Sequence, residues 1–102
     1  AFAKKPSSGK ILVDDGAKEA LQHRGKSLLA SGIRAVQGTF DRRDLVVISG
    51  LNGEPVARGL ANFSSTEVEQ IKGKSSKEIK EILQNPKSTV VVHRDNLALV
   101  HS

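Results

Sequence analysis

The sequence contains no cysteine, methionine, tryptophan or tyrosine, and three phenylalanines are its only large aromatic residues. Without cysteine, neither a disulfide framework nor a thiolate metal site is possible, and a reducing cytoplasm suits this composition. Without tryptophan or tyrosine, the chain has few rings on which unpaired bases could stack. No apolar run approaches the roughly 18 residues that a membrane span needs, so we expect no membrane contact.

The chain is short. With 102 residues and 37% hydrophobic content, it is predicted to form one small domain with a modest core. A nucleotide-binding lobe and a substrate lobe would not fit together in this length, so a complete metabolic enzyme is not expected. Residues 1–9 lack the apolar region of a signal peptide and are rich in Lys, Pro, Ser and Gly. We therefore predict a linker over residues 1–9 and a folded domain over residues 10–102, downstream in a longer protein.

The formal net charge of +5 and the pI near 9.8 permit contact with polyanions without requiring it. The basic residues fall into three clusters: Lys18, His23, Arg24, Lys26 and Arg34; Lys72, Lys74, Lys77 and Lys80; and Arg42 with Arg43. The second cluster alternates with glutamates, as solvated helices usually do, and the third is flanked by aspartates. The first cluster is the least balanced by neighbouring acids.

The first third of the chain has the pattern of a strand followed by a short helix. Lys10–Val13 is apolar enough for a strand, and Asp14 and Asp15 can cap the helix that follows. Gly25 suits the left-handed position at the end of that helix. Residues 24–32 are predicted to form a loop, and the next strand begins at Ile33.

The clearest local signal is a hairpin. Asn52-Gly53 lies between the apolar runs Leu45–Ile48 and Val56-Ala57, and this dipeptide favours a type I′ turn with positive φ at both residues. The sequence therefore predicts two antiparallel strands joined at Asn52-Gly53.

The rest of the chain carries two helix starts and two final strands. Ser64–Glu67 and Ser75–Glu78 both match a capping box, and Thr89–His93 and Leu97–Val100 have strand composition. Together these elements predict an α+β fold, a small mixed β pseudo-barrel of about five to six strands with two to three short helices.

No motif in the chain predicts catalysis. Gly25-Lys26-Ser27 and Gly73-Lys74-Ser75 both match the end of a phosphate-binding loop, but the glycine required five positions earlier is replaced by Ala20 and Val68. The three histidines lack the spacing of metal ligands. We therefore predict no catalytic, cofactor-binding or metal-binding residue in this chain.

The order of residues nevertheless resembles a known family. The motifs are Gly16-Ala17, Gly25, Gly32-Ile33, Gly38, Asp44–Val46, Val56–Gly59 and Ser64-Ser65. Their arrangement over roughly residues 10–65 resembles the PUA domain, named for pseudouridine synthases and archaeosine transglycosylases. More specifically, Gly59–Ser65, Ile71–Ile79 and Val92–Leu97 resemble the C-terminal PUA domain of the bacterial glutamate 5-kinase family, which extends the resemblance to nearly the whole chain.

This resemblance implies a PUA-like fold and a non-catalytic accessory or regulatory role. Enzymes of that family use ATP and magnesium to make γ-glutamyl phosphate from glutamate in proline biosynthesis, in an N-terminal amino-acid kinase domain that this chain does not contain. The implied partner is that kinase domain, and the implied location is the cytoplasm.

The alternative is an RNA-binding module that recognises structured RNA. In PUA domains the first helix and the loop after it face RNA, and the corresponding residues here are Lys18, Gln22, Arg24, Gly25, Lys26, Ser27 and Leu28. Because aromatic residues are scarce, such binding would depend on phosphates and shape.

Overall fold

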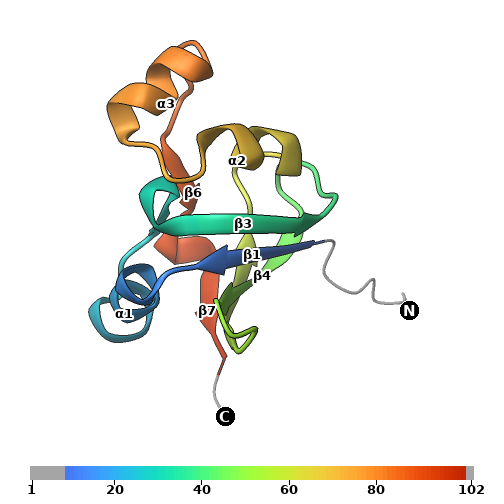
Figure 1. Ribbon diagram of the computed structural model, residues 1–102, viewed down its shortest axis with the longest axis vertical. Helices are drawn as coiled ribbons and strands as arrows, with labels where there is room; N and C mark the ends of the chain where they lie inside the picture. Colours follow the sequence, from blue (N-terminus) through green and yellow to red (C-terminus); the bar gives the residue numbers. More distant parts are fainter. Residues whose placement is uncertain (1–8, 101–102) are drawn as a thin grey trace.

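The structure is a computed structural model that describes residues 9–100, and its centre is a curled five-stranded sheet (Figure 1). The sheet strands are β1 (Gly9–Val13), β3 (Ile33–Gly38), β4 (Leu45–Gly50), β5 (Pro55–Leu60) and β7 (Leu97–Leu99). A second sheet pairs β2 (Leu28–Leu29) with β6 (Val90–Val92). The helices are α1 (Asp15–Arg24), α2 (Ser65–Ile71) and α3 (Ser76–Ile82), with 3-10 turns η1 (Ala30–Gly32) and η2 (Arg94–Asn96).

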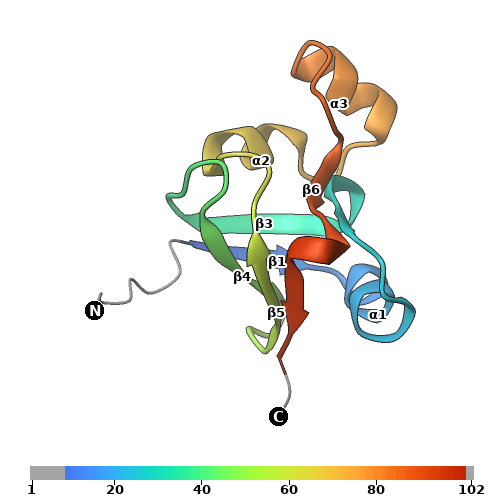
Figure 2. The same cartoon turned by 180° about the vertical axis from the view of Figure 1, so that it is seen from behind.

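The strands of the large sheet follow the order β3-β1-β4-β5-β7. β1 pairs antiparallel with β3 and parallel with β4, while β5 pairs antiparallel with both β4 and β7. β4 and β5 run side by side in Figure 2. The parallel pair brings Gly9 opposite Val46, although 36 residues separate them, and fixes the first strand in the middle of the sheet.

One face of this sheet forms the hydrophobic core. Ile11 and Val13 of β1 and Val46 and Ile48 of β4 are fully buried, at alternate positions along each strand. The helices add the side chains that close the core, namely Leu21, Val68, Ile71 and Ile79. The predicted α+β pseudo-barrel is therefore confirmed.

The predicted helix boundaries agree with the structure. The Ser64 hydroxyl accepts from the Glu67 N–H, and the Glu67 carboxylate accepts from the Ser64 N–H, which completes the first capping box. Ser75 and Glu78 form the second capping box in the same way. Short-range sequence signals therefore determined where α2 and α3 begin.

The hairpin is confirmed, but its predicted turn type is wrong. Gly53 has φ +89°, whereas Asn52 does not have positive φ. The Gly50 carbonyl accepts from the Gly53 N–H, and the Gly50 N–H donates to the Glu54 carbonyl, so three residues form the loop. The Asn52 side chain accepts from the Glu54 N–H at 2.9 Å, which holds Asn52 in the ordinary region. A three-residue loop with glycine at its last position replaces the type I′ turn.

The predicted loop over residues 24–32 is wrong in part, because this stretch contains the short strand β2 and the turn η1. Of the predicted linker over residues 1–9, Gly9 is the first residue of β1, and the rest lies outside the described residues. Within residues 9–100, no helix has the length and apolar character needed to cross a membrane.

Candidate functional site

The candidate site is built around α1. Asp14 caps the helix, and its Oδ1 accepts from the Ala17 N–H at 2.8 Å. Gly25 ends the helix with φ +60°, and the Lys26 N–H then donates back to the Ala20 carbonyl. This left-handed turn directs the chain sharply back along the helix, so that the following segment forms a wall beside α1.

The turn η1 packs closely against the start of α1. A Cβ atom on Gly32 would lie 2.5 Å from the Ala17 Cβ, so only glycine permits this approach. The Asp14 N–H donates to the Gly32 carbonyl at 3.0 Å and fixes the same contact through the backbone. The helix and the turn therefore form a rigid corner.

The segment between α1 and η1 is anchored to the end of the chain. Leu28 is buried and pairs with Val92 across the small sheet. The Ser27 hydroxyl accepts from the Arg94 N–H at 2.9 Å. Leu29, in contrast, is 48% exposed. The loop backbone is thus held by residues more than 60 positions away, while its outer side chains face solvent.

A groove of about 520 Å³ lies between α1, the loop and η1. Its lining consists mainly of small residues, with two leucines, one cation and one carboxylate: Asp14, Gly16, Ala17, Ala20, Lys26, Ser27, Leu28, Leu29, Ser31 and Gly32. Small side chains leave backbone groups accessible, so a ligand could approach the main chain closely here.

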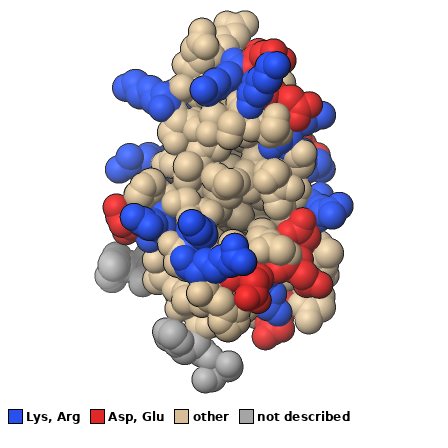
Figure 3. Space-filling view, turned by 90° about the vertical axis from the view of Figure 1, so that its left-hand side faces the viewer, with Lys and Arg blue, Asp and Glu red and all other residues tan. Residues whose placement is uncertain are grey.

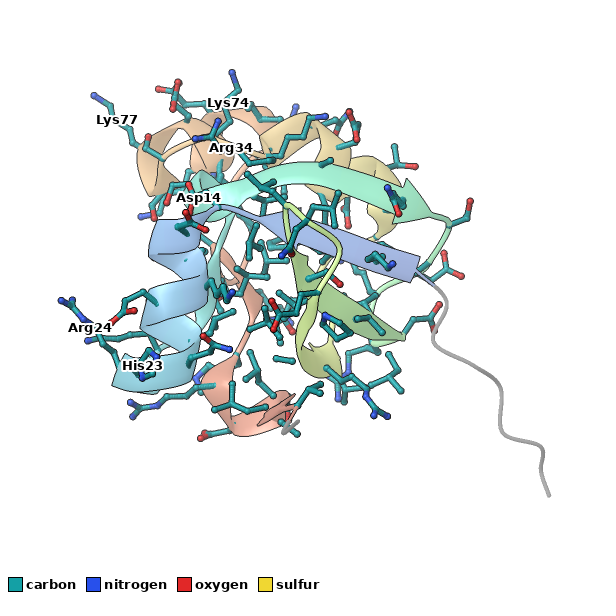
Figure 4. The ribbon with its side chains drawn as sticks, turned by 60° about the horizontal axis from the view of Figure 1, so that its bottom comes forward. Asp14, His23, Arg24, Arg34, Lys74 and Lys77 are labelled. Carbon is teal, nitrogen blue, oxygen red and sulfur yellow. The ribbon has the colours of Figure 1, made fainter. Side chains whose placement is uncertain are left out.

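Basic side chains lie at both ends of α1. Figure 4 places Arg24 and His23 at the C-terminal end, and Arg34 and Lys74 near Asp14 at the other end. The Arg34 Nε lies 3.6 Å from Asp14 Oδ2. The Gly73 N–H donates to the Ala30 carbonyl at 2.7 Å, which holds the segment that carries Lys74 against η1.

The surface view shows the same distribution. On the face that carries α1 and α3, Lys and Arg side chains gather above and below a central area without charge, and Asp and Glu side chains lie beside both groups, most of them at the lower right (Figure 3). Such a surface suits an extended anionic partner that crosses the uncharged area and meets cations at both sides.

The structure divides the seven predicted site residues. Lys26, Ser27 and Leu28 line the groove. Arg24 and Gly25 are exposed at the end of α1 and do not line it. Lys18 turns toward the β4–β5 hairpin, where its Nζ lies 3.6 Å from Glu54 Oε1. Gln22 is one turn after Lys18 on the same flank of the helix.

Sequence reasoning missed several residues of the site. Gly16, Ser31 and Gly32 line the groove, and Lys74 lies near one end of α1. The sequence pointed to Gly32-Ile33 only as one motif of the family resemblance. Lys74 lies 48 residues after Lys26, so no local signal could join the two.

The opposite side of the domain has a different electrostatic character. Arg42 and Glu67 form a two-contact ion pair between the β3–β4 turn and α2. The hydrogen bond from Arg42 lowers the pKa of Glu67, and the same contact raises the pKa of Arg42. The same kind of contact occurs in α3, on the face of α1, where the backbone hydrogen bond from Ser75 lowers the pKa of Glu78. These charged groups serve the fold itself.

The curled mixed sheet, with the groove beside the first helix, defines a small α+β pseudo-barrel domain. A family model described as the PUA domain matches residues 9–83. The chain belongs to the PUA domain family.

Relatives and solved structures give more detail. The chain is 48% identical over 100 residues to the glutamate 5-kinase of Dictyoglomus thermophilum, covering 98% of this chain and 27% of that protein, in its C-terminal part. It is similar to a PUA domain from Aeropyrum pernix K1 solved in a tartrate complex, with 27% identity, a TM-score of 0.62 and coverage of 92% and 42%. It is also similar to a chain of an H/ACA RNP bound to a substrate RNA, with 26% identity, a TM-score of 0.58 and coverage of 92% and 24%.

Proposed function

We propose that this chain is the accessory, regulatory domain of a glutamate 5-kinase. In this proposal an N-terminal amino-acid kinase domain of the same polypeptide makes γ-glutamyl phosphate from ATP and glutamate, as the first step of proline biosynthesis in the cytoplasm. The domain described here modulates that activity and supplies no reacting group.

The observation that carries the proposal is the 48% identity to a glutamate 5-kinase across almost the whole chain. The chain spans about a quarter of the length of the relatives that it matches. The enzymatic activity of the longer protein, its substrates and its kinase domain therefore belong to the proposal.

ATP and magnesium are assigned to the kinase domain in this proposal. Residues 9–100 contain no group of three or more His, Asp or Glu side chains that could hold a metal ion. Since magnesium prefers carboxylates and phosphate oxygens, this domain does not fit the metal site of the reaction.

Two measurements on the full-length protein and on this chain test the proposal. Deletion of residues 10–102 is expected to leave glutamate phosphorylation in place and to change its dependence on metal ions or its inhibition by proline. The 102-residue chain alone is expected to form no γ-glutamyl phosphate. Unchanged kinetics after the deletion, or product formation by the isolated chain, would contradict the proposal.

A second candidate function is the binding of structured RNA. The observation that favours it is the groove beside α1 with Arg24 and Lys26 toward one end and Arg34 and Lys74 toward the other. A structural neighbour comes from an RNP bound to a substrate RNA. Titration with structured RNA at several salt concentrations tests this function, because phosphate contacts make affinity fall steeply with salt.

A further inference from the structure

The face of the large sheet opposite the core carries a second apolar surface. Positions that alternate with the buried ones, and that are joined by the strand register, share this side of the sheet. They are Lys10 and Leu12 of β1, Ala35 and Gln37 of β3, Leu45, Val47 and the fully buried Ser49 of β4, Arg58 and Leu60 of β5, and Ala98 of β7. We call this set the outer sheet face.

The outer sheet face is more apolar than a solvated sheet requires. Leu12, Val47 and Leu60 are half-buried, and Leu45 is 40% exposed. None of these four belongs to the hydrophobic core cluster. An antiparallel sheet with one solvated side normally alternates apolar and polar residues, whereas here large apolar residues occupy both sides.

The charges on the outer sheet face have one sign. Lys10 lies opposite Val47, and Arg58 lies between Val47 and Ala98 in the register. No aspartate or glutamate occupies the positions of this face in β1, β3, β4, β5 and β7. A groove of about 670 Å³ at its margin includes Leu45, Arg58 and Ala98, with Asp95 beside them. The complementary surface is apolar with acidic groups.

The path of the chain brings any upstream domain to this face. β1 begins at Gly9, which pairs with Val46, and Leu45 and Val47 on either side of Val46 belong to the outer sheet face. Residues 1–8 can span at most about 28 Å. A domain attached before Ala1 is therefore tethered to the end of β1 that borders the face, and tethering raises its effective concentration to roughly the millimolar range.

We propose that the outer sheet face docks the kinase domain of the same polypeptide, through an apolar contact around Leu45 and Val47 with acidic groups of the kinase domain opposite Lys10 and Arg58. This inference rests on the proposed function, because the relatives extend far beyond the length of this chain. Contacts between domains of one chain commonly bury several hundred Å², and an apolar sheet face favours a fixed arrangement of the two domains.

Cysteine modification measures the docking directly, because this chain has no cysteine of its own. Leu45→Cys is introduced into the full-length protein and into the 102-residue chain, and maleimide modification of that site is followed by peptide mass. We expect modification at least about tenfold slower in the full-length protein, which corresponds to about 1.4 kcal/mol of protection. Leu51→Cys at the hairpin tip, where the side chain is 58% exposed, serves as the matched control and reacts equally in both.

A second variant guards against local unfolding. Ala98→Cys reports on the same face from another strand. When Leu45→Glu is added to the Ala98→Cys variant, we expect maleimide modification at position 98 of the full-length protein to reach the rate measured in the 102-residue chain. Leu51→Glu is expected to leave the protection intact. Equal modification of Leu45→Cys in the two proteins would overturn the docking.

The readouts also separate this inference from the proposed function. Fast modification of Leu45→Cys, combined with an altered metal or proline response after deletion of residues 10–102, rejects the docking and supports the regulatory role. Slow modification in a full-length protein that does not phosphorylate glutamate supports the docking and rejects the proposed function.

Discussion

The α1 groove and the helices α2 and α3 are both basic regions of the molecule, but their charged side chains have different roles. In α2 and α3, two complete capping boxes satisfy the first backbone N–H groups, and Lys72 is paired with Glu69. Around the groove, no carboxylate lies within 4.0 Å of a charged nitrogen of Arg24 or Lys26 among the described residues.

The difference shows that local charge density does not mark a binding surface by itself. The lysines of α3 resemble an ordinary solvated helix, as their alternation with glutamates predicted. The cations near the groove stand beside small residues that expose the backbone, and that combination suits a ligand better than charge alone.

The largest expected effect concerns the corner between α1 and η1. Gly32→Ala should lower the free energy of unfolding by about 2 kcal/mol, because the new Cβ would lie 2.5 Å from the Ala17 Cβ. Gly16→Ala is the matched control, since its Cβ meets its nearest atom at 3.5 Å and alanine favours a helix. Urea unfolding measures both variants, and equal stability would mean that the corner is not tightly packed.

The next effect concerns RNA, under the second candidate function. Arg24→Ala combined with Lys26→Ala should weaken binding of structured RNA about tenfold at low salt and reduce the salt slope by about two, one for each lost phosphate contact. Lys10→Ala combined with Arg58→Ala removes the same charge from the outer sheet face and should have little effect. If both pairs weaken binding equally, or if RNA does not bind at low salt, the groove is not an RNA site.

A smaller effect concerns the α2 capping box. Glu67→Ala should cost about 1 kcal/mol of stability, because it removes the hydrogen bond from the Ser64 N–H to the Glu67 carboxylate and the ion pair with Arg42. Glu67→Gln keeps a side chain that can complete the box, so it should cost less. Thermal unfolding of the two variants at pH 7 measures this order, and an equal loss would assign the whole effect to the charge.

The same residue predicts a pH dependence with a defined sign. Its pKa is lowered below 4.5 in the folded state, chiefly by the hydrogen bond from Arg42. The ion pair therefore stabilises the fold above pH 4.5, and this contribution is lost as the pH falls through the lowered pKa. The stability difference between the wild type and Glu67→Gln should shrink below pH 4.5, and a constant difference would show that the charge is not involved.

The smallest effect is expected at Lys72. Lys72→Gln removes an exposed ion pair with Glu69 three residues earlier, and such pairs contribute less than about 0.5 kcal/mol. Neither the melting temperature nor RNA binding should change measurably. A clear loss of RNA binding would show that Lys72 takes part in the RNA-binding surface.

Features that depend on a few neighbouring residues could be predicted. Asp14 and Gly25 define α1, and Ser64 and Ser75 begin the later helices, because each cap is completed by residues at most six positions apart. The hairpin position was equally clear. Its turn type could not be predicted, because the Asn52 side chain accepts a hydrogen bond from the Glu54 N–H, and this contact favours a three-residue loop that has the same sequence signal.

Features that depend on contacts between distant residues could not be predicted from the sequence. The strand β2 was predicted as loop, since two residues carry no period and their partners Val90 and Val92 lie some 60 positions later. Lys18 was expected at the site, but it lies on the other flank of α1, where its Nζ is 3.6 Å from Glu54 Oε1 of the hairpin. One wall of the groove also depends on a distant contact, the close approach of Gly32 to Ala17.

The sequence by itself therefore determined the elements, their caps and the family resemblance, because these follow from interactions within one turn or one hairpin. The tertiary structure alone decided which cations surround the groove and which apolar residues remain on the outer sheet face. The physical reason is that strand order and register place residues on a face, and the parallel pairing of β1 with β4 has no signal in either strand.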